Sequence, residues 1–153
     1  MNAVPRLTGA FLVVVWIGCA GRSDGTSPPA DTGAPPAAET TSIASVIDAL
    51  RAGGVRAEAA GSLQQPFFSP PAHVFAVEGG DLQLYEFASA ADAANAAAQV
   101  SPDGGSIGTR SMVWMAAPHF YRRGRIIAIY LGASAKVTSE LERILGRPFA
   151  ARA

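Results

Sequence analysis

A chain of 153 residues has room for one ordinary domain. Its 12 basic and 12 acidic residues balance, so the chain lacks the basic excess of a general nucleic-acid binder, and no nucleic-acid partner is expected. The single cysteine cannot form a disulfide within the chain and cannot make a zinc site by itself.

The first segment of the chain is a short apolar run that ends at this cysteine. Arg6 is its only charge, residues 10 to 18 read AFLVVVWIG, and the small residue Gly18 directly precedes Cys19. A positive start, a short apolar stretch and a small final residue are the order of a secretory signal. The run is also shorter than the roughly 20 apolar residues of a membrane-spanning helix. We therefore interpret residues 1 to 18 as a signal peptide.

The end of this segment, WIGC, resembles the lipobox of bacterial lipoproteins, although Trp16 stands where leucine is usual. The resemblance implies that Cys19 is lipidated, with fatty acids such as palmitate. Two acyl chains suffice for stable anchoring, because each buried methylene contributes about 0.8 kcal/mol. The implied location is the extracytoplasmic side of a bacterial cell envelope, with the membrane bound through the lipid. A plain cleaved signal and a short uncleaved anchor are the alternatives.

The next segment, residues 19 to 42, is predicted to be a flexible tether that begins at the lipidated cysteine. Residues 20 to 42 contain four prolines, three glycines and no large apolar side chain. Such a composition cannot bury enough apolar surface to offset the entropy lost on ordering.

A single globular domain is predicted for residues 43 to 150, and it opens with a helix. Apolar residues recur at helical spacing from Ile43 to Leu50, and Gly53-Gly54 ends the pattern. Three strands are predicted next, at residues 55 to 59, 73 to 77 and 82 to 87. Gly79-Gly80-Asp81 between the last two is typical of a hairpin turn.

Two further helices and two further strands complete the predicted domain. Ser89 caps an alanine-rich helix to about Val100, and a last helix runs from Ser134 to Leu145. Strands are predicted at residues 112 to 116 and 125 to 131, after a loop at residues 101 to 109. The order α-β-β-β-α-β-β-α contains no long series of parallel crossovers. We therefore expect an α+β fold with a mainly antiparallel sheet of about five strands and three helices packed on one face.

Three stretches of this domain carry a second resemblance. PFFSPP, VSPDGGSIGT and PHFYRRGRIIAIYLG, which begin at Pro66, Val100 and Pro118, are similar to a small uncharacterised domain of bacterial lipoproteins. The resemblance covers about residues 43 to 150. It implies a place in the cell envelope and adds no activity and no catalytic residue.

Residue types that carry catalysis or bind metals are sparse in the sequence. His73 and His119 lie far apart, and neither has a second ligand at i+2, i+3 or i+4, so no metal and no cofactor are expected. Ser106 lacks the strand-turn-helix context of a nucleophile, and Asp103 lies in ordinary Pro-Asp-Gly turn chemistry. A small envelope hydrolase that uses His119 with a serine is kept as an alternative, as is a purely structural envelope subunit.

Aromatic residues beside prolines are the most informative feature for function. We expect Pro118 to end regular strand pairing and leave a shallow apolar site open at the strand end. The predicted ligand-binding residues are Phe68, Trp114 and Tyr121 as walls, with His119 and Arg122 as a polar rim. The alternative is that the same aromatic residues close the core.

The basic cluster RRGR at residues 122 to 125 has two interpretations. It is an exposed turn whose charges keep a sheet edge soluble, or it meets lipid headgroups or an anionic polymer. Taken together, these features predict a lipid-anchored extracytoplasmic domain without catalytic activity. It is expected to bind an envelope protein or a small ligand.

Overall fold

The structure, a computed structural model, describes residues 41 to 152 and contains three helices and eight strands in that range. In chain order these elements are α1 (Ile43–Ala52), β1 (Ala57–Leu63), β2 (Ala72–Val77), β3 (Gly80–Glu86), α2 (Ala90–Ala97), β4 (Ser106–Ile107), β5 (Arg110–Ser111), β6 (Pro118–Arg123), β7 (Ile126–Gly132), α3 (Ala135–Leu145) and β8 (Ala150–Ala151). The predicted signal peptide, Cys19 and nearly all of the predicted tether lie outside the described residues.

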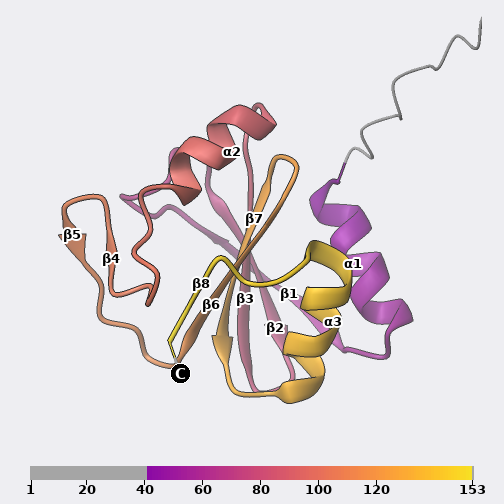
Figure 1. Ribbon diagram of the computed structural model, residues 1–153. Coiled ribbons are helices and arrows are strands. Elements are labelled where there is room, and N and C mark those ends of the chain that lie inside the picture. The colour runs from indigo at the N-terminus through magenta and orange to yellow at the C-terminus, as the bar shows by residue number, and fades with distance from the viewer. Residues whose placement is uncertain (1–40, 153) are drawn as a thin grey trace, which may run out of the picture. The chain divides into compact units, whose positions relative to one another are not determined.

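Six strands form one antiparallel sheet in the order β1-β2-β3-β7-β6-β8, and Figure 1 shows the helices arranged around it. The strands β4 and β5 pair separately as a hairpin. The predicted α+β class, the antiparallel sheet and the order of the helices and long strands are therefore confirmed. The strands that the sequence did not reveal, β4, β5 and β8, have two residues each, too few for a period-2 pattern.

The strand predicted for residues 112 to 116 is wrong. The structure has β6 at Pro118–Arg123 instead, so Pro118 begins a strand where we expected it to end one. Proline is tolerated as the first residue of a strand, because its missing N–H is lost where the ladder of hydrogen bonds starts. The preceding residues leave regular pairing, and the indole Nε1 of Trp114 donates to the carbonyl oxygen of Gly104 at 2.7 Å.

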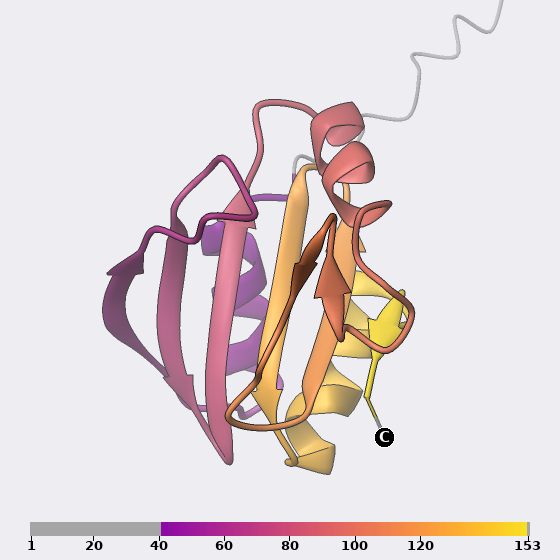
Figure 2. The ribbon, with the colours of Figure 1, turned by 90° about the vertical axis from the view of Figure 1, so that its left-hand side faces the viewer.

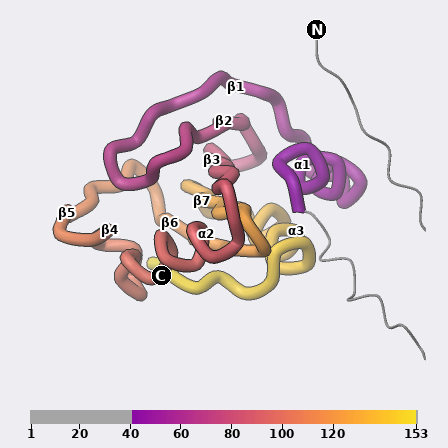
Figure 3. Tube along the Cα trace, turned by 90° about the horizontal axis from the view of Figure 1, so that it is seen from above, coloured from indigo at the N-terminus to yellow at the C-terminus, as the bar shows by residue number. Residues whose placement is uncertain are grey.

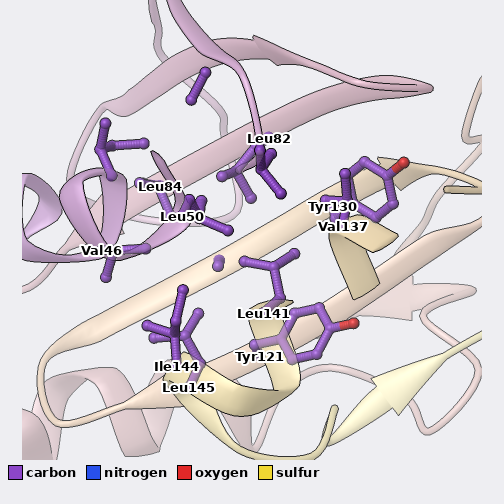
Figure 4. Packing of buried hydrophobic residues seen from close by; sticks show 14 of the residues in the cluster. Val46, Leu50, Leu82, Leu84, Tyr121, Tyr130, Val137, Leu141, Ile144 and Leu145 are labelled. Atoms are coloured by element: carbon purple, nitrogen blue, oxygen red, sulfur yellow. The ribbon is translucent and has the colours of Figure 1, made fainter. Parts of the chain in front are cut away.

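One face of the sheet packs against α1 and α3, and we call it the α1/α3 face. Leu50 of α1, Leu82 of β3 and Leu141 of α3 are fully buried in its core, as Figure 4 shows. Figure 3 shows α1 and α3 side by side, away from β4 and β5. Alternation along β7 directs Ile126, Ala128 and Tyr130 to this face.

The opposite face, which we call the α2 face, has its own core beneath α2. Ala93 and Ala96 of the helix pack there with Tyr85, Phe120 and Ile127 of the sheet. The expectation that all three helices share one face is therefore wrong for α2. The reason is that the central strands β3 and β7 are buried on both sides and need cover on both. Figure 2 shows α2 and the β4–β5 hairpin on one side of the sheet, with α1 and α3 on the other.

The close approach of β3 and β7 at Gly80 and Gly132 leads to a prediction about stability. A Cβ atom on Gly80 would overlap the backbone carbonyl oxygen of Leu131, which cannot move without disturbing the ladder. We expect Gly80→Ala to lower the free energy of unfolding, measured by urea denaturation, by about 1 to 3 kcal/mol, the usual range for overpacking.

The matched control for this substitution is Gly53→Ala at the end of α1. Gly53 has φ −76°, which alanine adopts freely, and its new Cβ would meet only the flexible side chain of Glu140. An equal loss in the two variants would show that the contact with Leu131 is not the cause.

Candidate functional site

A cleft of about 340 Å³ lies on the α2 face, between α2 and the segment that follows β1. Its lining residues come from three parts of the chain that are separate in sequence: Phe67, Phe68, Ser69, Phe87, Asp92, Asn95, Ala96 and Gln99. Its volume lies within the range of sites that take small ligands.

The floor of the cleft is aromatic. The rings of Phe67 and Phe68 meet edge to face with centroids 5.0 Å apart, and Phe68 meets Phe87 in the same way at 5.7 Å. Phe68 and Phe87 are buried, whereas Phe67 is only half-buried. These packed rings hold one another in place, so the floor is formed before any ligand arrives.

The rim of the cleft is polar and comes mainly from α2. Asp92 and Asn95 lie one helical turn apart, and Gln99 follows in the next turn, so all three lie along one side of this segment. Ser89 fixes the start of the helix, because its hydroxyl accepts from the backbone N–H of Asp92 at 3.0 Å and donates to the Asp92 carboxylate at 2.7 Å. The rim side chains of α2 are exposed to solvent.

The charge of the lining limits the ligands that the cleft suits. It contains one carboxylate, two side-chain amides and one hydroxyl, and no basic residue lines it. An anionic ligand would meet the carboxylate of Asp92 without a cation to compensate. The arrangement favours a neutral or cationic ligand with one apolar face and several hydrogen-bonding groups.

Of the five predicted ligand-binding residues, only Phe68 lines this cleft. Trp114 joins the same aromatic cluster through Phe67, which contacts Trp114 with ring centroids 6.2 Å apart. Trp114 also contacts Phe120 beneath it at 5.7 Å. The PFFSPP segment and the Trp114 segment therefore meet, and their contact is mostly packing.

The two predicted site residues Tyr121 and His119 lie on the α1/α3 face. Tyr121 is fully buried opposite Ala128, and the ring of His119 stacks on Tyr130 at 5.9 Å. Phe120, between them in sequence, points to the α2 face. A groove that joins Phe68 to Tyr121 and His119 is therefore ruled out by the sheet that separates them. The prediction failed because the alternation was applied to residues 112 to 116, which are not a strand.

Arg122 lies on the α2 face but outside the cleft. It lines a second hollow, of about 320 Å³, whose other walls include alanines of α2 and the ring of Phe149. The neighbouring arginines have structural contacts: Arg123 donates to the carbonyl oxygen of Ile144 at 2.6 Å, and Arg125 pairs with Glu86. The RRGR cluster is thus partly committed to the fold.

Asp103, which the sequence placed in a Pro-Asp-Gly turn, organises its own loop. The hydrogen bond from the Ser101 hydroxyl, at 2.7 Å, and then that from the Gly105 N–H, at 2.9 Å, lower the pKa of Asp103 to about 2. Gly104 of this loop packs on Phe120, on the face of the sheet away from His119. Among residues 41 to 152, neither histidine hydrogen-bonds to a serine or to an acidic side chain. A catalytic triad is not assembled there.

Residues 41 to 152 contain no group of three or more histidine, cysteine, aspartate or glutamate side chains that could hold a metal ion. Within the same range, none of the helices has both the length and the apolar character needed to cross a bilayer.

The polar rim of the cleft was missed in the sequence, although a signal for it existed. The spacing of Asp92, Asn95 and Gln99 on the predicted alanine-rich helix already placed three polar side chains on one side. The aromatic floor gave no such signal, because Phe68 and Phe87 meet only through the tertiary fold.

No protein family, no curated protein and no solved structure matches this chain. A function for the cleft therefore has to be argued from its own geometry.

Proposed function

We propose that this protein is a non-catalytic binding protein of the bacterial cell envelope that holds a neutral, sugar-like ligand in the cleft beside α2. One observation carries the proposal: an aromatic floor lies beneath a rim of amide, carboxylate and hydroxyl groups, with no cation among them.

A sugar residue suits this cleft because it has both an apolar side and hydroxyl groups. One side of a pyranose ring presents C–H groups, which pack well on a phenyl ring such as that of half-buried Phe67. Its hydroxyl groups both donate and accept hydrogen bonds, as do the amides of Asn95 and Gln99. The carboxylate of Asp92 supplies a further acceptor, which a hydroxyl can use without a net charge on the ligand.

The envelope location is supported by the sequence of the N-terminal segment. The lipobox resemblance at Cys19 implies a lipid anchor on the extracytoplasmic side. We propose that the lipid holds the domain close to the membrane while the cleft binds its ligand. An envelope protein in place of a glycan is the alternative partner.

The cleft is tested by nuclear magnetic resonance on the chain from residue 19 carrying Cys19→Ser, titrated with soluble N-acetylhexosamine oligomers. We expect the side-chain amide signals of Asn95 and Gln99 to shift in a saturable manner. We expect Asn95→Ala combined with Gln99→Ala to weaken binding by roughly 5- to 150-fold in Kd, because two hydrogen bonds of about 0.5 to 1.5 kcal/mol each are lost.

The control for this titration is Asp48→Ala, which removes an exposed polar side chain from α1 on the other face. Its Kd should equal that of the parent chain. If the oligomers shift neither amide, or if the double variant binds as tightly as the parent, the cleft is not a glycan site.

A further inference from the structure

The loop between β5 and β6, residues 112 to 117, exposes two large apolar side chains to solvent. Val113 and Met115 expose 96% and 102% of their reference surface. Leu63 and Phe149, the other large apolar side chains that are exposed among the described residues, reach only 43% and 36%. Full exposure of two such side chains in one short loop needs an explanation, because apolar surface left in water contributes nothing to folding and lowers solubility.

The outward direction of Val113 and Met115 is held by the contacts of their neighbours. The backbone N–H of Met112 donates to the carbonyl oxygen of Gly105 at 2.9 Å, and the indole of Trp114 donates to that of Gly104 at 2.7 Å. Met112 and Trp114 both pack against the core of the α2 face. The inward side chains of Met112 and Trp114 thus alternate with the outward side chains of Val113 and Met115. The contacts of the inward pair hold the loop in this orientation.

We propose that this loop rests on the membrane surface, with the side chains of Val113 and Met115 inserted between the lipid headgroups. A protein partner is disfavoured by area, because two side chains fall far short of the roughly 800 Å² per partner that a specific interface buries. A bilayer needs no such area and no complementary shape. Exposed Arg110, at the start of β5, adds a positive charge beside the loop that suits phosphate groups of lipids.

The position of the loop in the fold is compatible with an anchor in the same membrane. Ala117 accepts a hydrogen bond from the N–H of Gly132, at one end of β7, whereas Thr41 lies beside Gly124 at the other end. The seven residues of β7 separate these ends by roughly 20 Å. Residues 20 to 40 span at most roughly 75 Å when fully extended, which exceeds the distance between the two ends of β7. The chain can therefore reach Thr41 from the bilayer while the loop contacts the same membrane.

Trp114 itself provides the test, because it lies between the two inserted side chains and the chain has only one other tryptophan, Trp16. The experiment uses the lipidated protein, which begins at Cys19 and has Trp114 as its one tryptophan, reconstituted into phosphatidylcholine vesicles with and without lipids brominated near the headgroups. We expect the brominated lipids to quench the fluorescence of Trp114 at least twofold. We expect Val113→Ser combined with Met115→Ser to abolish that quenching, also in high salt.

The matched control is Leu63→Ser, which removes an exposed apolar side chain outside the loop and should leave the quenching of Trp114 unchanged. Val113 and Met115 are fully exposed, so thermal melting should show the double variant to be as stable as the parent chain. Quenching that persists in the double variant, or its absence in the parent chain, overturns the proposal. So does a protein that copurifies with the parent chain but not with the double variant while Trp114 stays unquenched.

The membrane contact of the loop rests on the envelope anchoring proposed above and not on the glycan ligand. The vesicle experiment distinguishes a failure of the loop contact from a failure of the anchoring. A chain that sediments with vesicles without quenching of Trp114 contradicts the loop contact alone. A chain that does not sediment with vesicles contradicts the anchoring, and the loop contact with it.

Discussion

Replacing Tyr121 by alanine is expected to lower the free energy of unfolding by about 3 to 5 kcal/mol, as for other large aromatic residues removed from a core. The side chain is fully buried on the α1/α3 face, where Figure 4 shows its ring beside Leu141 of α3. Removal of the ring leaves a cavity between β6 and α3 that the surrounding strands cannot close. Urea denaturation of the parent and variant chains measures the loss.

Tyr121→Phe is expected to have the opposite sign. The hydroxyl of Tyr121 is buried without a hydrogen-bond partner among the described residues. A buried polar group in that state costs about 1 to 3 kcal/mol, so its removal should leave the protein at least as stable and up to that much more stable. A clear loss of stability in Tyr121→Phe would mean that the hydroxyl has a partner, such as a buried water molecule.

The parent chain and Tyr121→Phe are expected to lose different amounts of stability at alkaline pH. Burial, followed by the nearby carboxylate of Glu142, raises the pKa of Tyr121 from its ordinary 10.0 to about 12. The unfolded chain therefore releases this proton at a lower pH than the folded one. The resulting contribution to stability is complete below pH 10 and is lost as the pH rises from 10 towards 12. In Tyr121→Phe the fall in stability over this range should be smaller than in the parent.

Cys19→Ser is expected to remove all fatty-acid label from the protein and to release it from membranes or block its processing. The thiol of Cys19 is the only one in the chain, so no other thioether to diacylglycerol can form. Growth with radiolabelled palmitate, followed by fractionation of the envelope, measures both effects. Trp16→Leu, which restores the usual lipobox residue, serves as the control and should carry at least as much label as the parent. Equal label in Cys19→Ser and the parent would refute lipidation.

The starts of the three helices and the ends of α1 and α3 were predictable from the sequence, because they depend on contacts a few residues apart. The end of α2 was not, since it lies at Ala97 and we predicted about Val100. Ser42 caps α1 through its hydrogen bonds with Ser45, and Ser89 and Ser134 cap α2 and α3 in the same local way. Gly146 ends α3 where the sequence placed it. The strand β7 was found within one residue of its start and end, since its unbroken apolar run is typical of a strand covered on both faces.

The position of β6 and the site built on it were not predictable in this way. Apolar and aromatic side chains occur in both halves of the stretch from Met112 to Tyr121, so period-2 alternation fits more than one choice of strand. The bond from Trp114 to Gly104 joins residues ten positions apart and draws the first half of this stretch out of the sheet. Because the strand was predicted six residues too early, Tyr121 and His119 were placed in one groove with Phe68. In the structure the sheet separates them from Phe68.

The sequence by itself determined the α+β class, the antiparallel hairpins and the helix caps, because each follows from local periodicity, turn residues or side-chain capping. Only the tertiary structure decided that α2 covers the face opposite α1 and α3, and that Phe67, Phe68 and Phe87 meet beneath Asn95 and Gln99. These contacts join residues far apart in the chain, and a sheet with apolar residues on both faces accepts a helix on either. Which face α2 covers is set by the sum of many packing contacts, none of which leaves a pattern in the sequence.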